Sequence, residues 1–153
     1  MIQGKYLSVE DDLSDVFTIR NKIFIDEMGK DSSYINEGLD AFSIHATVTN
    51  EKDIVCGSGR LTLMLDDNND TSFSMDLLGV LPEERHKGYG EFLVRILADK
   101  AMLSGATSIK IECNPATAPF FEKLYFKKDS IDGDVCKMHV DMADFKHPCE
   151  HCK

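Results

Sequence analysis

The stretch that decides the fold is LLGVLPEERHKGYGEFLVRIL, residues 77–97. An apolar run ends at Pro82, which cannot continue a central strand, and an amphipathic helix follows Gly90. Glycines at the start of a helix let backbone N–H groups approach a ligand, and the helix dipole favours an anion there. The stretch therefore predicts a phosphate or pyrophosphate site made by Arg85, His86, Lys87, Gly88, Tyr89 and Gly90.

Two familiar phosphate motifs are absent from this loop. Leu93 follows Gly90 where a dinucleotide fingerprint needs its third glycine, and no Gly-Lys-Ser/Thr ending of a P-loop is present. The remaining Arg-x-x-Gly-x-Gly pattern resembles the acyl-CoA signature of the GNAT N-acetyltransferase superfamily. Downstream, NPATAPFFEKLYF (114–126) is similar to the second motif of that family. A turn that merely caps a helix is the alternative explanation of the glycines.

The resemblance implies an α/β (α+β) fold with a mixed, mostly antiparallel central sheet flanked by helices. The residue pattern agrees with the order β-α-β-β-β-α-β-α-β-β. Helices are predicted from about Asp11 to Gly29, over 88–104 and over 115–124. Strands are predicted over 5–9, 42–49, 54–65, 71–80, 107–113, 125–128 and 135–142. We assign residues 1–142 to one acetyltransferase domain and residues 143–153 to a His/Cys-rich C-terminal tail.

Composition narrows the cellular setting and the partners. The 153 residues carry a net charge of −10, which argues against a nucleic-acid partner. The sequence has no apolar run of membrane-spanning length and no signal-peptide pattern, so we expect no membrane partner. Five scattered cysteines favour a reducing compartment, and we expect a cytoplasmic protein.

The resemblance also implies where the cosubstrate acetyl-CoA lies. The pantetheine arm would pair with the strand end formed by Leu78, Gly79 and Val80. Gly79 interrupts an apolar strand, which predicts a bulge, although a glycine that only relieves packing fits the pattern as well. Asn114 would bind the pantetheine arm or a nearby water, with a helix N-cap as its alternative role. Phe121 would line the same site.

Asp76 is the candidate general base. Strand alternation predicts that it shares a face with Leu78 and Val80, and it could take the amine proton through water. A solvated strand acid is the alternative. The family's general acid is a tyrosine at the position held here by Phe121, so Tyr125 is the candidate acid, with Cys113 or water as substitutes.

Four residues in the first half resemble an acceptor-side pattern of one GNAT branch: Arg20, Phe24, Glu27 and Asp40. Arg20 and Glu27 are seven residues apart, which predicts one helix face. We favour structural roles for these side chains, as an ion pair or a loop cap, and a satisfied histidine for His45.

The sequence therefore predicts an acetyl-CoA-dependent N-acetyltransferase that transfers acetyl directly to a primary amine in a ternary complex. The acceptor would be a small molecule or a peptide. Two alternatives remain from other classes: a non-catalytic acyl-CoA-binding module, and a metal- or redox-responsive regulatory protein.

The tail HPCEHC (147–152) contributes four candidate zinc ligands, namely His147, Cys149, His151 and Cys152. This ligand chemistry suits tetrahedral zinc, but one short segment rarely encloses the ion alone. Further ligands would come from Cys136, from His139, or from a second copy of the chain in a homodimer. A frayed tail and a redox thiol pair are the alternatives.

Zinc loading tests the tail directly. We expect reduced, untagged protein to retain about one equivalent of zinc after desalting. The affinity should fall as the pH is lowered, because thiolate and neutral imidazole are the ligating forms. Elemental analysis provides the measurement, and a Cys149→Ser/Cys152→Ser variant is the control. Metal content of the wild type equal to that of the variant would contradict the assignment.

Overall fold

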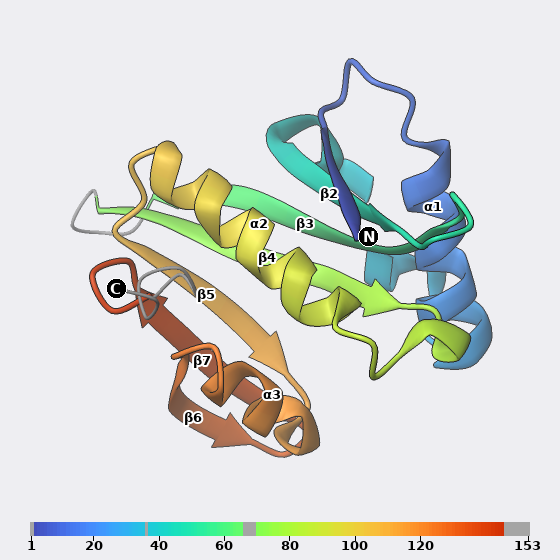
Figure 1. Cartoon of the computed structure of the whole chain (residues 1–153). Coiled ribbons are helices and arrows are strands. Elements are labelled where there is room, and N and C mark those ends of the chain that lie inside the picture. The colour runs from blue at the N-terminus through green and yellow to red at the C-terminus, as the bar shows by residue number, and fades with distance from the viewer. Residues whose placement is uncertain (1, 36, 66–69, 146–153) are drawn as a thin grey trace. The chain divides into compact units, whose positions relative to one another are not determined.

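The computed structural model describes residues 2–35, 37–65 and 70–145 (Figure 1). They form two compact units, Met1–Thr62 with Met75–Leu97, and Leu63–Ser74 with Ala98–Lys153. Hydrogen bonds order the strands β1-β2-β3-β4-β5-β7-β6 in a seven-stranded sheet. The strands are β1 Gln3–Leu7, β2 Ser43–Thr49, β3 Val55–Leu65, β4 Thr71–Val80, β5 Ser108–Cys113, β6 Lys127–Asp132 and β7 Val135–Asp141.

Helical segments separate these strands. The α-helices are α1 Ser14–Arg20, α2 Tyr89–Leu103 and α3 Ala118–Glu122, and a π-helix, η1 Asn21–Glu27, continues α1. Short 3₁₀ turns are η2 Ser32–Ile35, η3 Glu37–Phe42, η4 Pro82–Glu84 and η5 Pro115–Thr117. The β4–β5 pairing is parallel, while β1–β2, β2–β3, β5–β7 and β6–β7 are antiparallel. The predicted mixed, mostly antiparallel sheet is thus confirmed.

In the first unit, small residues let α2 pack tightly on the sheet. A Cβ added at Gly4 would lie 2.6 Å from the Phe92 ring, and one added at Gly59 would lie 2.8 Å from a Leu97 methyl. The glycines of β3 therefore mark close helix–sheet contact, not interruptions of the strand. Leu93, Leu97 and the facing Val48 are fully buried, as expected for a close-packed core.

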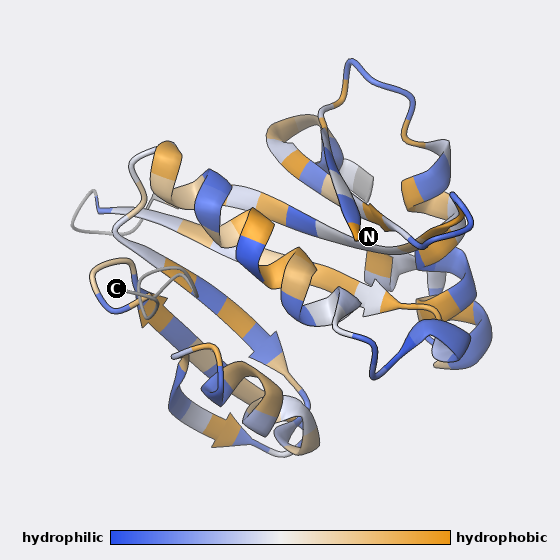
Figure 2. Cartoon of the chain, in the orientation of Figure 1, coloured by the Kyte–Doolittle hydropathy of each residue, from blue (hydrophilic) through white to orange (hydrophobic). Residues whose placement is uncertain are grey.

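The second unit is built on an antiparallel β5–β7–β6 arrangement. Ser108 lies opposite Asp141 and Cys113 opposite Cys136. Buried and exposed residues alternate along β7, and Figure 2 shows hydrophobic and hydrophilic bands alternating along β5 and β7. This period of two is the one expected of strands with one buried face. No helix in the described part of the chain is long and apolar enough to cross a membrane.

The first helix differs from the single helix predicted between Asp11 and Gly29. Helix α1 begins at Ser14, whose N–H donates to Asp12 Oδ1 at 2.9 Å. After Arg20 the backbone becomes a π-helix, and Met28 N–H donates to Ile23 O at 3.0 Å. Gly29, at φ +69°, ends the segment as predicted. The 3₁₀ turns η2 and η3 lie between this segment and β2.

Strand β4 also departs from prediction at the residues next to the proposed site. Gly79 was the expected bulge, but the left-handed residue is Leu77, at φ +49°. A Cβ at Gly79 would lie 2.8 Å from Ile23 Cδ1, so this glycine permits close approach of η1. The packing explanation of Gly79 is therefore the one that its surroundings support.

The irregularity at Leu77 changes which way the neighbouring side chains point. Asp76 binds Arg60, whereas Leu78 lies against the position of Gly59, the residue before Arg60 on β3. Gly59 and Arg60 are adjacent on β3 and therefore face opposite sides of the sheet. Their neighbours on β4, Leu78 and Asp76, consequently lie on opposite faces. The prediction that they share a face was wrong, because a left-handed residue breaks the period of two.

Candidate active site

The glycine loop forms an open helix start. Gly88 adopts φ +92°, and a Cβ added there would meet nothing within 4 Å. The first helical hydrogen bond of α2 runs from Phe92 N–H to Gly88 O at 3.1 Å. The N–H groups of Tyr89, Gly90 and Glu91 consequently have no intrahelical acceptor. Free donors, open space and the positive end of the helix dipole make this loop suitable for an anion.

The cationic side chains of the loop are already paired with acids. Arg85 donates from both terminal nitrogens to Glu27, at 2.6 and 2.7 Å, and from Nε to the Val80 carbonyl at 2.9 Å. Lys87 Nζ lies 3.1 Å from Glu84. The hydrogen bonds from Arg85 lower the pKa of Glu27. The backbone N–H groups are therefore the hydrogen-bond donors of this loop that have the fewest other partners.

The other loop residues have distinct surroundings. His86 is exposed and adopts φ +65°, an uncommon conformation for a residue with a side chain. The Tyr89 side chain is buried. At the end of β4, Leu81 N–H donates to Cys56 O at 2.8 Å. The strand end therefore remains tied to β3 on one side.

A cluster of buried charged side chains lies on the face of the sheet that carries α1 and η1. Arg20 Nη1 contacts both oxygens of Asp40 at 3.0 Å, and Arg60 Nη1 contacts Asp40 Oδ1 at 3.1 Å. Both arginine side chains are 1% exposed. Burial lowers the pKa of Arg20, and the hydrogen bonds that Arg20 donates to Asp40 oppose that effect. Burial of two guanidinium groups is tolerable only with such partners.

His45 completes the cluster as a neutral imidazole. Arg20 Nη2 lies 3.1 Å from His45 Nδ1, and His45 Nε2 lies 3.2 Å from the Asp40 carbonyl oxygen. Because arginine can only donate, Nδ1 accepts and the ring proton resides on Nε2. Burial lowers the pKa of His45, and the neighbouring guanidinium charges act in the same direction.

Asp76 is the exposed end of this cluster. Arg60 donates from Nε to Oδ1 at 2.9 Å and from Nη2 to Oδ2 at 2.8 Å, a fork that fits a carboxylate. The Asp76 side chain is 41% exposed, although Arg60 behind it is buried. Burial alone would lower the pKa of Arg60, but the hydrogen bonds and charge of Asp76 raise it.

The prediction that Arg20 and Glu27 share one helix face was wrong. Arg20 turns into the buried cluster, whereas Glu27 pairs with Arg85 of the glycine loop at about one-third exposure. The π-helix explains the difference, because its wider turns shift the angular position of every later residue. Phe24 packs against Tyr34, with ring centroids 5.6 Å apart.

The second unit contains the residues of the second motif. Asn114 is an N-cap, and its side chain accepts from Ala116 N–H at 2.9 Å. Phe121 is buried and makes an edge contact with Phe126, with centroids 5.5 Å apart. Tyr125 adopts φ +75°, a backbone conformation that glycine adopts more readily than a residue with a side chain. None of these observations assigns Asn114, Phe121 or Tyr125 a chemical role.

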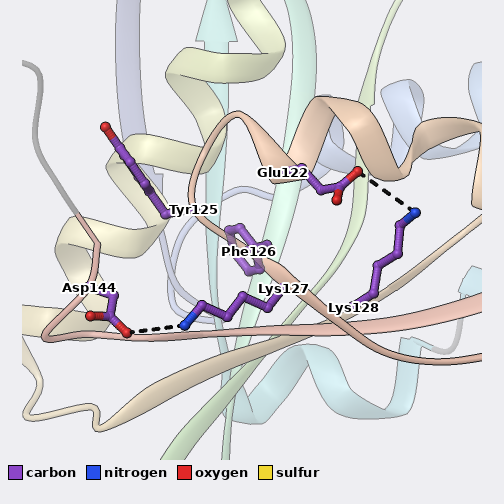
Figure 3. A pocket seen from close by; sticks show the side chains of 6 residues that line it. All are labelled: Glu122, Tyr125, Phe126, Lys127, Lys128 and Asp144. Atoms are coloured by element: carbon purple, nitrogen blue, oxygen red, sulfur yellow. Dashed lines mark ion pairs between the residues drawn. The ribbon is translucent and has the colours of Figure 1, made fainter.

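Tyr125 also lines an open depression of the second unit (Figure 3). Two ion pairs, Lys127–Asp144 and Lys128–Glu122, cross it at 3.9 Å each. Its residues are Glu122, Tyr125, Phe126, Lys127, Lys128 and Asp144. The mixed, mutually paired charges give this depression no preference for an anion or a cation.

The cysteines of the described residues are free thiols. Burial raises the pKa of Cys113 to about 11, so its thiol is protonated at neutral pH. No group of three or more metal-ligating side chains lies among residues 2–35, 37–65 and 70–145. His147, Cys149, His151 and Cys152 lie outside the described residues, and their zinc site stays a prediction.

Arg60 was not predicted from the sequence as a site residue, and no partner was predicted for His45. The available signal was a single cation in the middle of the apolar strand sequence VCGSGRLTLML, residues 55–65. A buried arginine demands an acid, but the sequence does not show which of many acids lies nearby. Asp40 comes from a turn twenty residues away, which only the fold brings close.

Comparisons with known proteins agree with this architecture. The family model described as the acetyltransferase (GNAT) family matches residues 10–126. The fold is similar to that of a protein of Lactobacillus plantarum provisionally named an N-acetyltransferase (TM-score 0.79, 17% identity, 92% of this chain and 98% of that one). The comparison with curated proteins gave no match.

Two further solved structures have the same fold. One is an acyl-CoA N-acyltransferase of Pseudomonas aeruginosa (TM-score 0.76, 12% identity, 92% of this chain and 99% of that one). The other is Escherichia coli ElaA (TM-score 0.74, 16% identity, 92% of this chain and all 100% of that one). These identities support the fold alone. The family match covers most of the sequence, and the chain belongs to the acetyltransferase (GNAT) family of enzymes.

The neutral state of His45 predicts a pH-dependent stability. Between about pH 7.5 and pH 5.5, the unfolded chain protonates this histidine near its ordinary pKa of about 6.5, while the folded chain resists. The unfolded state then binds more protons, so the free energy of unfolding falls as the pH falls, by at most about 1.4 kcal/mol per pH unit.

Urea unfolding of the wild type and of a His45→Gln variant across this range measures the effect. The variant should be less stable at pH 7.5 but should show a shallower dependence on pH. Equal slopes in the two proteins would contradict the assignment of a neutral, buried His45.

Proposed function

We propose that this protein transfers an acetyl group from acetyl-CoA directly to a primary amine within a ternary complex. The observation that carries the proposal is the open helix start at Gly88, which follows β4 within the family-matched residues. Family membership implies an acyl-CoA cosubstrate, and an anion site in this position fits its pyrophosphate. The acceptor remains a small amine or a peptide amine in this proposal.

The residues of the first unit fit the proposed cosubstrate. The N–H groups of Tyr89 and Gly90 would hold the pyrophosphate, with Gly88 supplying the open space that a side chain would occupy. Backbone groups of Leu78, Gly79 and Val80 would pair with the pantetheine arm, and the Val80 carbonyl already accepts from Arg85. Bound acetyl-CoA supplies a thioester whose carbon–sulfur bond breaks as the nitrogen–carbon bond forms.

Asp76 is proposed to receive the amine proton through water. Its carboxylate is partly exposed at the edge of the charge cluster, where the guanidinium fork of Arg60 holds it in place. A carboxylate held in this way suits binding of an ammonium group and relay of its proton. Tyr125 remains the proposed source of the proton for the leaving thiol, with water as its substitute, and Asn114 and Phe121 remain proposed contacts of the cosubstrate.

One observation favours a second candidate function, a non-catalytic acyl-CoA-binding module. Phe121 is a buried aromatic side chain where the family motif has its tyrosine acid. A protein that binds acetyl-CoA without transferring the acetyl group would still need the glycine loop, but it would need no general acid. Turnover of an amine separates the two functions, because both predict binding of acetyl-CoA.

The glycine loop gives the first functional test. The variant Gly88→Asp places a negative charge where the pyrophosphate would lie, so we expect at least about tenfold weaker CoA binding by calorimetry. The matched control is Gly88→Asn, which has the same size, lacks the charge and tolerates the positive φ. Equal CoA affinities of the two variants would remove this loop from the site.

Transfer itself is measured by thiol release and by mass spectrometry of the acceptor. The panel of amines contains putrescine, lysine, glucosamine, tyramine and a peptide with a free N-terminus, each with acetyl-CoA. We expect acetylation of at least one amine by the wild type. Tight CoA binding with no acetylated product would favour the binding module.

The proposed proton relay predicts a pH-dependent defect. The variant Asp76→Asn should reduce the rate of acetylation mainly toward pH 6, where deprotonation of the amine limits, and less toward about pH 9. Its CoA affinity should stay within about twofold of wild type, because Asp76 lies outside the glycine loop. The matched control is Asp15→Asn, an exposed acid on α1. An unchanged profile across this range would identify Asp76 as structural.

A further inference from the structure

Arg60 connects a buried carboxylate to an exposed one. Its Nη1 contacts Asp40 at 3.1 Å, while Nε and Nη2 contact the two oxygens of Asp76 at 2.9 and 2.8 Å. Asp40 is held in turn by Arg20, which contacts both of its oxygens at 3.0 Å. Because a guanidinium group is planar, three hydrogen bonds leave it no freedom to rotate.

The consequence is a fixed orientation of the Asp76 carboxylate. An aspartate that is 41% exposed ordinarily samples several rotamers at the surface. The fork from Arg60 uses one acceptor position on each oxygen of Asp76, and each oxygen has a second one. The fork comes from the buried side, so the remaining acceptor positions are available to a group that approaches from solvent.

The face of β4 places this carboxylate beside the proposed transfer site. Asp76 and Gly79 face the side of the sheet that carries α1 and η1, since one binds Arg60 and the other abuts Ile23. Gly79 belongs to the strand end proposed for the pantetheine arm, only three residues further along. An amine bound by Asp76 would thus lie on the face where η1 approaches the strand.

Charge balance alone does not account for this arrangement. Arg20 and Arg60 together carry two positive charges against the single negative charge of Asp40, so the cluster needs a second acid. A purely neutralising acid would be most effective if it were buried like Asp40. Asp76 instead keeps 41% of its side chain in solvent, where a ligand can reach it.

We propose that Arg60 is a positioning residue for acetyl transfer, and that it fixes Asp76 to bind the ammonium group of a cationic acceptor. This inference rests on the proposed function and narrows its substrate class to amines that arrive protonated. The acceptor donates ammonium hydrogens to Asp76, and one of its protons passes through water to this carboxylate before the nitrogen attacks the acetyl carbon. The carbon–sulfur bond then breaks, the nitrogen loses a second proton, and the leaving thiolate takes up one proton. Arg60 touches no substrate and acts only through Asp76.

A double-mutant cycle on Arg60 and Asp76 tests this role. Arg60→Lys keeps a positive charge near Asp40 but loses the fork to Asp76, because an ammonium group cannot reproduce that geometry. The measured quantity is kcat/KM for the best amine of the panel at saturating acetyl-CoA. We expect Arg60→Lys to lower it about tenfold when Asp76 is present, and less than about twofold in the Asp76→Asn background.

The matched control is Arg95→Lys, the same substitution in α2, where the guanidinium lies 3.7 Å from Glu91. Its kcat/KM should equal that of the wild type, and the KM for acetyl-CoA should not change in any variant. Thermal unfolding of every variant confirms that the enzyme assayed is folded.

The outcomes separate this inference from the proposed function. Equal losses in the two Asp76 backgrounds, in an active enzyme, would overturn the positioning role alone. Equal kcat/KM for cationic amines and for a neutral aniline acceptor would overturn the ammonium assignment. A wild type that acetylates no amine of the panel would overturn the proposed function and this inference with it.

Discussion

Two guanidinium groups are buried in the first unit with a single buried carboxylate between them, and the arrangement of that unit depends on this cluster. Arg20 comes from α1, Asp40 from η3 and Arg60 from β3, and His45 of β2 closes the group. Removal of Asp40 would leave two buried cations facing each other, and breaking a buried pair typically costs about 3–5 kcal/mol. The cluster therefore joins α1 and η3 to β2 and β3, whose backbone pairing already sets their own register.

The residues of this cluster have two kinds of role, one structural and one chemical. Arg20, Asp40 and His45 are buried and contact one another, so they define geometry. Asp76 reaches solvent and has acceptor positions left, so it can serve a ligand. Such a division gives a surface carboxylate the rigidity of the core, which loops and solvated acids lack.

Prediction from sequence succeeded where the signal is local. The glycine loop, the helix after it and the order of strands and helices along the chain follow from periodicity and from the family motifs, and the structure contains them. The face of Asp76 could not be predicted, because one left-handed residue, Leu77, reverses the alternation that the prediction assumed. The π-helix likewise separates Arg20 from Glu27, and no local pattern signals it. Arg60 was missed because its partners lie far away in the sequence.

Two departures from regular structure lie near one glycine, Gly79. Leu77 is left-handed, and two residues later Gly79 lies against the π-helix η1, where an added Cβ would be 2.8 Å from Ile23 Cδ1. Strained backbone and π-helical turns are costly, and proteins often retain them at functional sites. Glu27, at the end of the same π-helix, holds Arg85 of the glycine loop, so one short segment contacts both the strand end and the loop. That ion pair is about one-third exposed and adds little stability, so its effect is to hold the loop arginine on Glu27. The helix start is then left to backbone donors, which attract an anion without holding a fixed counter-charge of their own.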